Sequence, residues 1–189
     1  MNHLLSPSAR RLLALAILLM LVAGVLLLRA SSSTSATLIP SFSGSQDADG
    51  AVGDVNLTID DTQHPAISGL DPDLRVAVEA ASRSANRDGV ALQITSGWRS
   101  VGYQQRLLER AIENYGSESE ARRWVATPMK SAHVRGEAVD IGPTDAAYWM
   151  AQHGPQFGLC QVYANEVWHY ELLTSPGGVC PEMKTDGAS

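Results

Sequence analysis

The chain has 189 residues, which is enough for one domain with appended segments. Hydrophobic residues make up 44% of it and charged residues 18%, a composition typical of a globular protein. The formal net charge is −6, but the first 36 residues carry three arginines and no acid. The remainder therefore has 11 basic against 20 acidic residues, a net −9. Such an acidic body argues against binding to nucleic acid, whose phosphates need basic partners.

The N-terminal region contains an unbroken apolar run from Leu12 to Leu28. At about 1.5 Å per residue it spans roughly 25 Å, which is short but sufficient for a bilayer crossing. Arg10 and Arg11 precede it, which predicts a cytoplasmic N-terminus. Residues 1–29 are either a signal peptide cleaved near Ala36 or an uncleaved transmembrane anchor. Both interpretations predict an extracytoplasmic protein, secreted or anchored in the cell envelope.

The domain boundaries follow from composition. Residues 30–56 are rich in Ser, Thr, Gly and Ala, which predicts a flexible tether that buries little apolar surface. We expect the folded domain at 57–182 and a short tail at 183–189.

Capping and periodicity signals predict the elements of this domain. Asp71 followed by Pro72 predicts the start of a helix that Gly89 ends. A strand at 90–95, a turn at 96–100 and a helix at 102–115 should follow. Further along the chain, the same signals predict a helix from a Ser117 cap to about Val125, a strand at 137–141, a helix at 144–153 capped by Thr144, and strands at 158–163 and 168–173. Because these elements do not alternate regularly as βαβ units, the predicted class is α+β.

Residues that bind metals and transfer protons gather in two clusters, at 131–140 and at 166–169. His133 and Asp140 are seven residues apart, and Gly136 between them permits a turn, so that both can face one cavity. In the second cluster His169 opens a predicted strand, and Glu166 lies in the turn before it.

These residue types suit a catalytic zinc site, which has three protein ligands, an open position and a general base. Two imidazoles and one carboxylate leave zinc positively charged, and the metal lowers the pKa of a bound water to about 7. Glu166 would accept a proton from that water and later donate it to the leaving amine. Arg99, in the turn after a predicted strand, is the candidate for stabilising the oxyanion.

Each of these residues also has an ordinary structural interpretation. The two histidines could pack in the core, Asp140 could pair with Arg135, Glu166 could be a solvated turn residue, and Arg99 could be a surface arginine. Spacing alone is a weaker signal than an HExxH or a paired CxxC motif.

Three motifs, taken in their order along the chain, favour the catalytic zinc site over the ordinary structural roles. Residues 131–140 read S-x-H-x-x-G-x-A-x-D, residues 166–169 read E-x-W-H, and residues 96–100 read S-G-W-R-S. Over roughly residues 70–173 the chain resembles the VanY-type D-alanyl-D-alanine carboxypeptidases, zinc peptidases of family M15. The resemblance implies the small fold shared with the hedgehog signalling domain, an antiparallel sheet with flanking helices.

The resemblance also implies roles for individual residues. It makes His133, Asp140 and His169 the ligands of Zn2+. It makes Glu166 the general base and Arg99 the group that polarises the scissile carbonyl. It places three further residues in the substrate pocket: Ser131, Gln104 and Tyr163.

The implied reaction is hydrolysis of the C-terminal D-Ala-D-Ala bond of peptidoglycan stem peptides by a zinc-bound water. The expected partners are that peptide and, through the N-terminal segment, a membrane; the protein is expected to be a monomer. Residues 162–164 read V-Y-A where the family often has R-Y-P, and the usual insertion before E-x-W-H is missing. Two alternatives follow: a dipeptidase or endopeptidase of the same fold, or a non-catalytic zinc-containing module that binds the cell wall.

Cys160 and Cys180 are the only two cysteines. An even number of cysteines in an exported protein predicts a disulfide, with a cysteine–zinc role as the alternative. The bridge would close a loop of about twenty residues that contains Glu166 and His169, worth roughly 3 kcal/mol on the chain-entropy model. Glu171 shares a strand face with His169 and is a candidate for orienting it.

Overall fold

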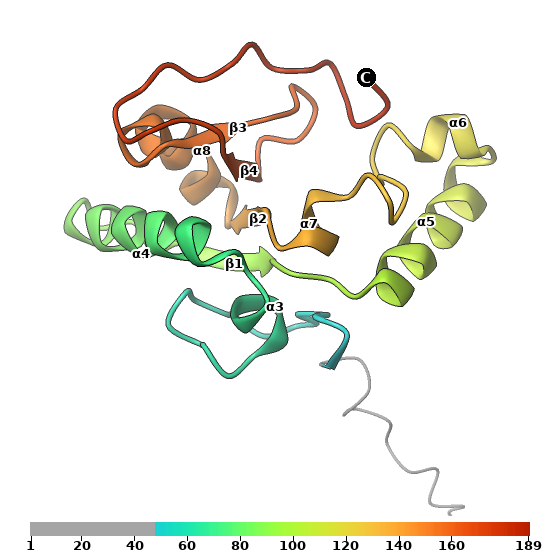
Figure 1. Cartoon of the computed structure of the whole chain (residues 1–189), viewed down its shortest axis with the longest axis horizontal. Coiled ribbons are helices and arrows are strands. Elements are labelled where there is room, and N and C mark those ends of the chain that lie inside the picture. Colours follow the sequence, from blue (N-terminus) through green and yellow to red (C-terminus); the bar gives the residue numbers. More distant parts are fainter. Residues whose placement is uncertain (1–47) are drawn as a thin grey trace, which may run out of the picture. The chain divides into compact units, whose positions relative to one another are not determined.

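The computed structural model describes residues 48–189 (Figure 1). The predicted leader at 1–29 and most of the predicted tether lie outside the described residues. Within residues 48–189, none of the helices combines the length and the apolar character that a membrane crossing needs. The elements in chain order are α3 (Pro65–Ser68), α4 (Pro72–Arg87), β1 (Gln93–Ser96), α5 (Val101–Tyr115), α6 (Glu118–Ala121), α7 (Ala132–Arg135), β2 (Ala138–Gly142), α8 (Thr144–His153), the 3-10 helix η1 (Gly154–Phe157), β3 (Leu159–Gln161) and β4 (His169–Leu172).

The four strands form one antiparallel sheet in the order β1-β2-β4-β3. All five residues of β2 are buried, as expected for a central strand covered on both faces. The register pairs Asp140 of β2 with Ser96 of β1 on one side and with His169 of β4 on the other. The predicted α+β class with an antiparallel sheet and flanking helices is confirmed, and this register brings three distant stretches of the sequence together.

Helix α4 packs against the sheet, and it begins where the sequence predicted. The Asp71 carboxylate accepts hydrogen bonds from the backbone N–H groups of Asp73 and Leu74, and Pro72 occupies the first helical turn. The buried face of α4 consists of Leu74, Val78, Ala81 and Ala85. These side chains join the main hydrophobic core with residues of β1, β2, β4 and α8. Figure 1 shows α5 and α6 at the right of the view, well apart from α4 at the left.

Three local details differ from the sequence prediction. Strand β1 begins at Gln93 rather than Val90. Helix α6 ends at Ala121 rather than near Val125, because the N–H groups of Arg123 and Trp124 bond three residues back and tighten the chain into turns. Thr144 is the first residue of α8 and does not cap it, since the N-cap position is held by Pro143, which makes no side-chain capping bond.

The packed body begins within the stretch expected to be tether. The Asp49 carboxylate accepts hydrogen bonds from the Ser100 hydroxyl at 2.7 Å and from the Arg106 guanidinium at 2.6 Å. Val52 is buried in the main core. The domain therefore reaches back at least to Asp49.

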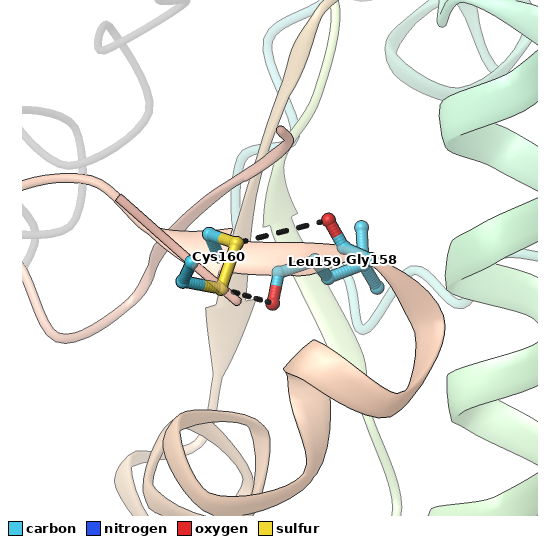
Figure 2. The surroundings of a disulfide bond; sticks show 4 residues. Gly158, Leu159 and Cys160 are labelled. Carbon is cyan, nitrogen blue, oxygen red and sulfur yellow. Dashed lines mark hydrogen bonds between the residues drawn. A yellow bond between two sulfur atoms is a disulfide. The ribbon is translucent and has the colours of Figure 1, made fainter. Parts of the chain in front are cut away.

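The C-terminal residues also pack onto the body. Cys160 and Cys180 form the predicted disulfide, with their Cα atoms 5.6 Å apart (Figure 2). Beyond it, residues 181–189, here called the strap, return along the segment after β3. The Lys184 N–H donates to the Val162 carbonyl and the Ala164 N–H donates to the Lys184 carbonyl, each at 2.9 Å. The segment expected to be a separate tail is therefore hydrogen-bonded to the domain.

Candidate metal centre

His133 is positioned by the short helix α7. The Ser131 hydroxyl caps its start, and Gly136 ends it with a φ of 76°. A side chain at Gly136 would also collide with the Gly69 carbonyl oxygen, so both the conformation and the space require glycine. His133 Nδ1 lies 2.8 Å from the Gly97 carbonyl oxygen, which only accepts. Nδ1 therefore carries the proton, and Nε2 presents a lone pair to the site.

His169 is positioned by strand pairing and by an acidic neighbour. It is the first residue of β4 and lies opposite Asp140 in the register. Its Nε2 atom is 3.1 Å from a carboxylate oxygen of Glu171. This contact holds a proton on Nε2, so Nδ1, which faces Asp140, is the ring atom free to bind a metal once it is deprotonated. A carboxylate orients a metal-binding histidine in this way.

Three acceptor atoms converge on one point. His133 Nε2 and His169 Nδ1 are 3.2 Å apart, and Asp140 Oδ1 lies 3.3 Å from the first and 3.1 Å from the second. Bonds of 2.0–2.1 Å at tetrahedral angles would put the ligand atoms of a zinc ion about 3.3 Å apart. The buried trio could hold a metal ion, and its atom types and spacing fit zinc.

Arg99 lies directly behind Asp140. Its guanidinium donates to Asp140 Oδ2 at 2.9 Å, to the Ser96 hydroxyl at 2.8 Å and to the Gln104 side-chain oxygen at 3.1 Å. The alternative in which Asp140 pairs with Arg135 is wrong, because Arg135 pairs with Glu137 on the surface. Arg99 thus fixes the orientation of the Asp140 carboxylate and leaves Oδ1 for the site.

The charges of the trio favour a cation at its centre. Burial lowers the pKa of His133, which keeps that imidazole neutral. Burial alone would raise the pKa of Asp140, but His133, His169 and Arg99 hold it well below its usual range. Burial would lower the pKa of His169, yet its hydrogen bonds to Asp140 and Glu171 raise it to about 9. In the metal-free protein His169 therefore also carries a proton on Nδ1, which faces Asp140, and a metal cation bound there would replace that proton.

Glu166 lies beside this trio in the turn before β4. Its side chain is only 10% exposed, and Oε2 is 4.0 Å from His169 Nδ1. Burial raises the pKa of Glu166 to about 7. A carboxyl group with such a pKa is suited to accepting and returning a proton at neutral pH.

All eight residues predicted for the site line one cavity of about 160 Å³. Gln104 is fully buried, and its amide also donates to the Ala126 carbonyl at 2.8 Å, so it holds Arg99 in place. The Tyr163 ring lies 5.2 Å from the His169 ring. Seven further residues line the cavity without having been predicted for the site, among them Trp124 and Gly187. Trp124 lies after α6, in residues that were predicted to be helical but form turns, and Gly187 belongs to the strap.

A buried His–Asp–His trio with a carboxylate beside it, carried on a small antiparallel sheet, defines a candidate metal-binding domain. The family described as VanY, D-alanyl-D-alanine carboxypeptidase, matches residues 68–174, more than half of the chain. The chain belongs to this family.

Known relatives agree with this assignment. A D-alanyl-D-alanine carboxypeptidase of Enterococcus faecalis (strain ATCC 700802 / V583) is 29% identical over 115 residues, which cover 48% of this chain. The match spans only 43% of that relative's length. VanYB in complex with D-Ala-D-Ala has a TM-score of 0.53 at 25% identity, covering 56% of this chain and 72% of its own. A mutant of the vancomycin resistance D,D-pentapeptidase VanY, from a VanB-type cassette and in complex with Zn(II), has a TM-score of 0.51 at 25% identity, covering 54% and 71%.

Proposed function

We propose that this protein is a zinc-dependent carboxypeptidase that removes the terminal D-alanine from peptidoglycan stem peptides. The observation that carries the proposal is the convergence of His133, Asp140 and His169 at 3.1–3.3 Å, with Glu166 beside them. Membership of the VanY family and the similarity to VanYB, which was solved with D-Ala-D-Ala, support the choice of substrate.

The ligand set is His133 Nε2, His169 Nδ1 and one oxygen of Asp140. A zinc ion held there would lower the pKa of a coordinated water to about 7 and polarise the scissile carbonyl. Glu171 and the Gly97 carbonyl fix the two imidazole tautomers, so that both lone pairs face inward.

Glu166 is the proposed general base. Its buried carboxylate, with a pKa of about 7, accepts a proton from the nucleophile and returns it to the amine of the departing D-alanine. A non-catalytic wall-binding module has no use for such a buried and costly carboxyl group.

Arg99 has two tasks in this scheme. Its three hydrogen bonds hold Asp140 in the ligand orientation. A guanidinium carries five N–H donors, so two are left to stabilise negative charge on the substrate carbonyl oxygen. Ser131 and Tyr163 line the same cavity and are the proposed substrate contacts.

We place the enzyme outside the cytoplasm, tethered to the membrane or secreted. The Cys160–Cys180 disulfide supports this placement, because such bonds persist in oxidising compartments. The apolar run at 12–28 supports it from the sequence.

The test is the release of D-alanine. The full-length chain is loaded with zinc and incubated with a muramyl pentapeptide ending in D-Ala-D-Ala, with and without a chelator. D-alanine should appear only without the chelator. No release from the pentapeptide together with D-alanine release from free D-Ala-D-Ala would favour the dipeptidase alternative. Zinc binding without release from either substrate would favour the wall-binding module.

A further inference from the structure

The strap, residues 181–189, is fastened to the body at three points. The disulfide at Cys180 holds its start, and the two backbone bonds of Lys184 hold its middle against residues 162–164. Near its end, Asp186 is only 8% exposed and accepts a 2.8 Å hydrogen bond from the Arg123 guanidinium. Figure 1 shows this segment running from the β3 side of the sheet toward α6.

The end of the strap forms part of the active-site wall. Gly187 lines the same cavity as the metal-binding trio, next to Trp124 and Val125. The Arg123 carbonyl accepts from the Gly187 N–H and from the Asn165 side chain, each at 3.1 Å. One carbonyl therefore ties the strap, the turn after α6 and the loop that carries Glu166 into a single wall.

This wall stands on the side of the site where the leaving group must lie. Asn165 precedes Glu166 directly, and Tyr163, between the two residues bonded to Lys184, lines the cavity. The base returns its proton to the departing amine, so the leaving residue approaches Glu166. Anything attached beyond that residue has to pass the strap.

We propose that the strap is the specificity element of this enzyme: it limits the leaving group to one residue and thereby makes the site a carboxypeptidase site. The inference rests on the proposed function for the direction in which the substrate lies. The strap lies beyond the residues 68–174 that match the family. The disulfide and the Arg123–Asp186 ion pair keep the wall closed.

The test compares two peptides on the full-length, zinc-loaded chain. One ends in D-Ala-D-Ala, and the other carries an added C-terminal glycine, so that cleavage of the same bond releases the dipeptide D-Ala-Gly. Asp186→Ala removes the ion pair, and a chain that ends at Cys180 removes the strap while keeping the disulfide and all family-matched residues. The second variant answers the question if the first does not fold.

We expect the wild-type protein to release D-alanine and to release D-Ala-Gly at least about tenfold more slowly. Both variants should shift this ratio about tenfold toward the dipeptide, a change of about 1.4 kcal/mol in relative barrier. The matched control is Arg122→Gln, since Arg122 neighbours Arg123 but, within residues 48–189, its side chain forms an ion pair with Glu118 alone, on the surface at 3.9 Å. The control should leave the ratio unchanged.

A binding measurement separates this inference from the proposed function. In a Glu166→Gln background, calorimetry gives the Kd of each peptide without turnover. The closed wall should weaken binding of the extended peptide about tenfold, and removal of the strap should abolish that difference. Absence of D-alanine release by the wild type would contradict the proposed function alone. An unchanged Kd ratio without the strap, equal binding of both peptides by the intact chain, or binding of neither would overturn the role of the strap.

Discussion

Glu166 carries two opposed properties in one side chain. Its burial suits the proposed role in proton transfer, because burial raises the pKa of the carboxyl group to about 7. The same burial opposes folding, because a carboxylate loses its hydration in the folded state. The folded pKa lies above the unfolded value near 4.5, so the protein loses stability as the pH rises from 4.5 through 7.

The first prediction concerns the substitution Glu166→Gln. Turnover should fall by about 10²–10⁴-fold, since the general base is lost, while zinc still binds. In the metal-free protein, the neutral amide should raise the melting temperature at pH 8 and leave it nearly unchanged at pH 4. Calorimetric melts at the two pH values check the sign. A lower melting temperature at pH 8 would contradict the assignment of a destabilising buried carboxylate.

The second prediction concerns Glu171, whose carboxylate oxygen accepts a hydrogen bond from His169 Nε2 at an N–O distance of 3.1 Å. Glu171→Gln should weaken zinc binding about 10–100-fold, because the histidine loses the partner that fixes its tautomer. Competition with a chromogenic chelator measures the affinity. Glu137→Gln is the matched control, as Glu137 pairs with Arg135 on the surface. Equal affinities in the two variants would remove Glu171 from the metal site.

At the scale of elements, the sequence predicts best what depends on near neighbours. The cap at Asp71, the left-handed glycine at Gly136 and the strand around Asp140 all follow from local chemistry and are found. Contacts between distant stretches leave no such local signal. The bond from Arg99 to Asp140 spans 41 residues, and nothing in either neighbourhood distinguishes it from the pairing with Arg135.

The strap was missed for a related reason. Most of its residues are exposed and Asp186 is its one buried residue, so the sequence predicts only a short tail after the disulfide. Beyond the predicted disulfide, its attachment depends on the Asp186 carboxylate and on backbone hydrogen bonds, which any sequence can make. Likewise, Asp49 belongs to a Gly-, Ser- and Ala-rich stretch, and only its bonds to Ser100 and Arg106 show where the body begins.

The third prediction tests the end of helix α7. Gly136→Ala should destabilise the fold by more than about 1–2 kcal/mol, because it combines a left-handed backbone with a collision at the Gly69 carbonyl. Gly116→Ala is the control, with a φ of 78° and open space around it, so it should cost only about 1 kcal/mol. Urea unfolding gives both values. A cost at Gly136 no larger than at Gly116 would mean that the close approach to Gly69 does not matter.

At the scale of the whole molecule, the disulfide joins β3 to the start of the strap and encloses β4 with half of the metal centre. It restricts the unfolded chain over a loop of about twenty residues, which is worth roughly 3 kcal/mol. A reducing agent should therefore lower the melting temperature by several degrees. The double variant Cys160→Ser, Cys180→Ser should have a lower melting temperature than the wild type, and the reducing agent should not change it. A wild-type melt unaffected by complete reduction would show that the bridge adds no stability.

Asp140 lies on a central strand that is buried along its whole length, whereas Glu166 lies on a loop. We therefore expect the backbone around these two residues to open at different rates. Backbone amides of residues 138–142 should exchange with deuterium among the slowest in the domain, since they open only when the sheet comes apart. Glu166 sits on a loop whose order depends on the strap, and the amides of that loop should exchange much sooner. If the protein is loaded with zinc, warming should stop turnover at a temperature where zinc is still bound. Cooling should then restore activity without a second addition of zinc.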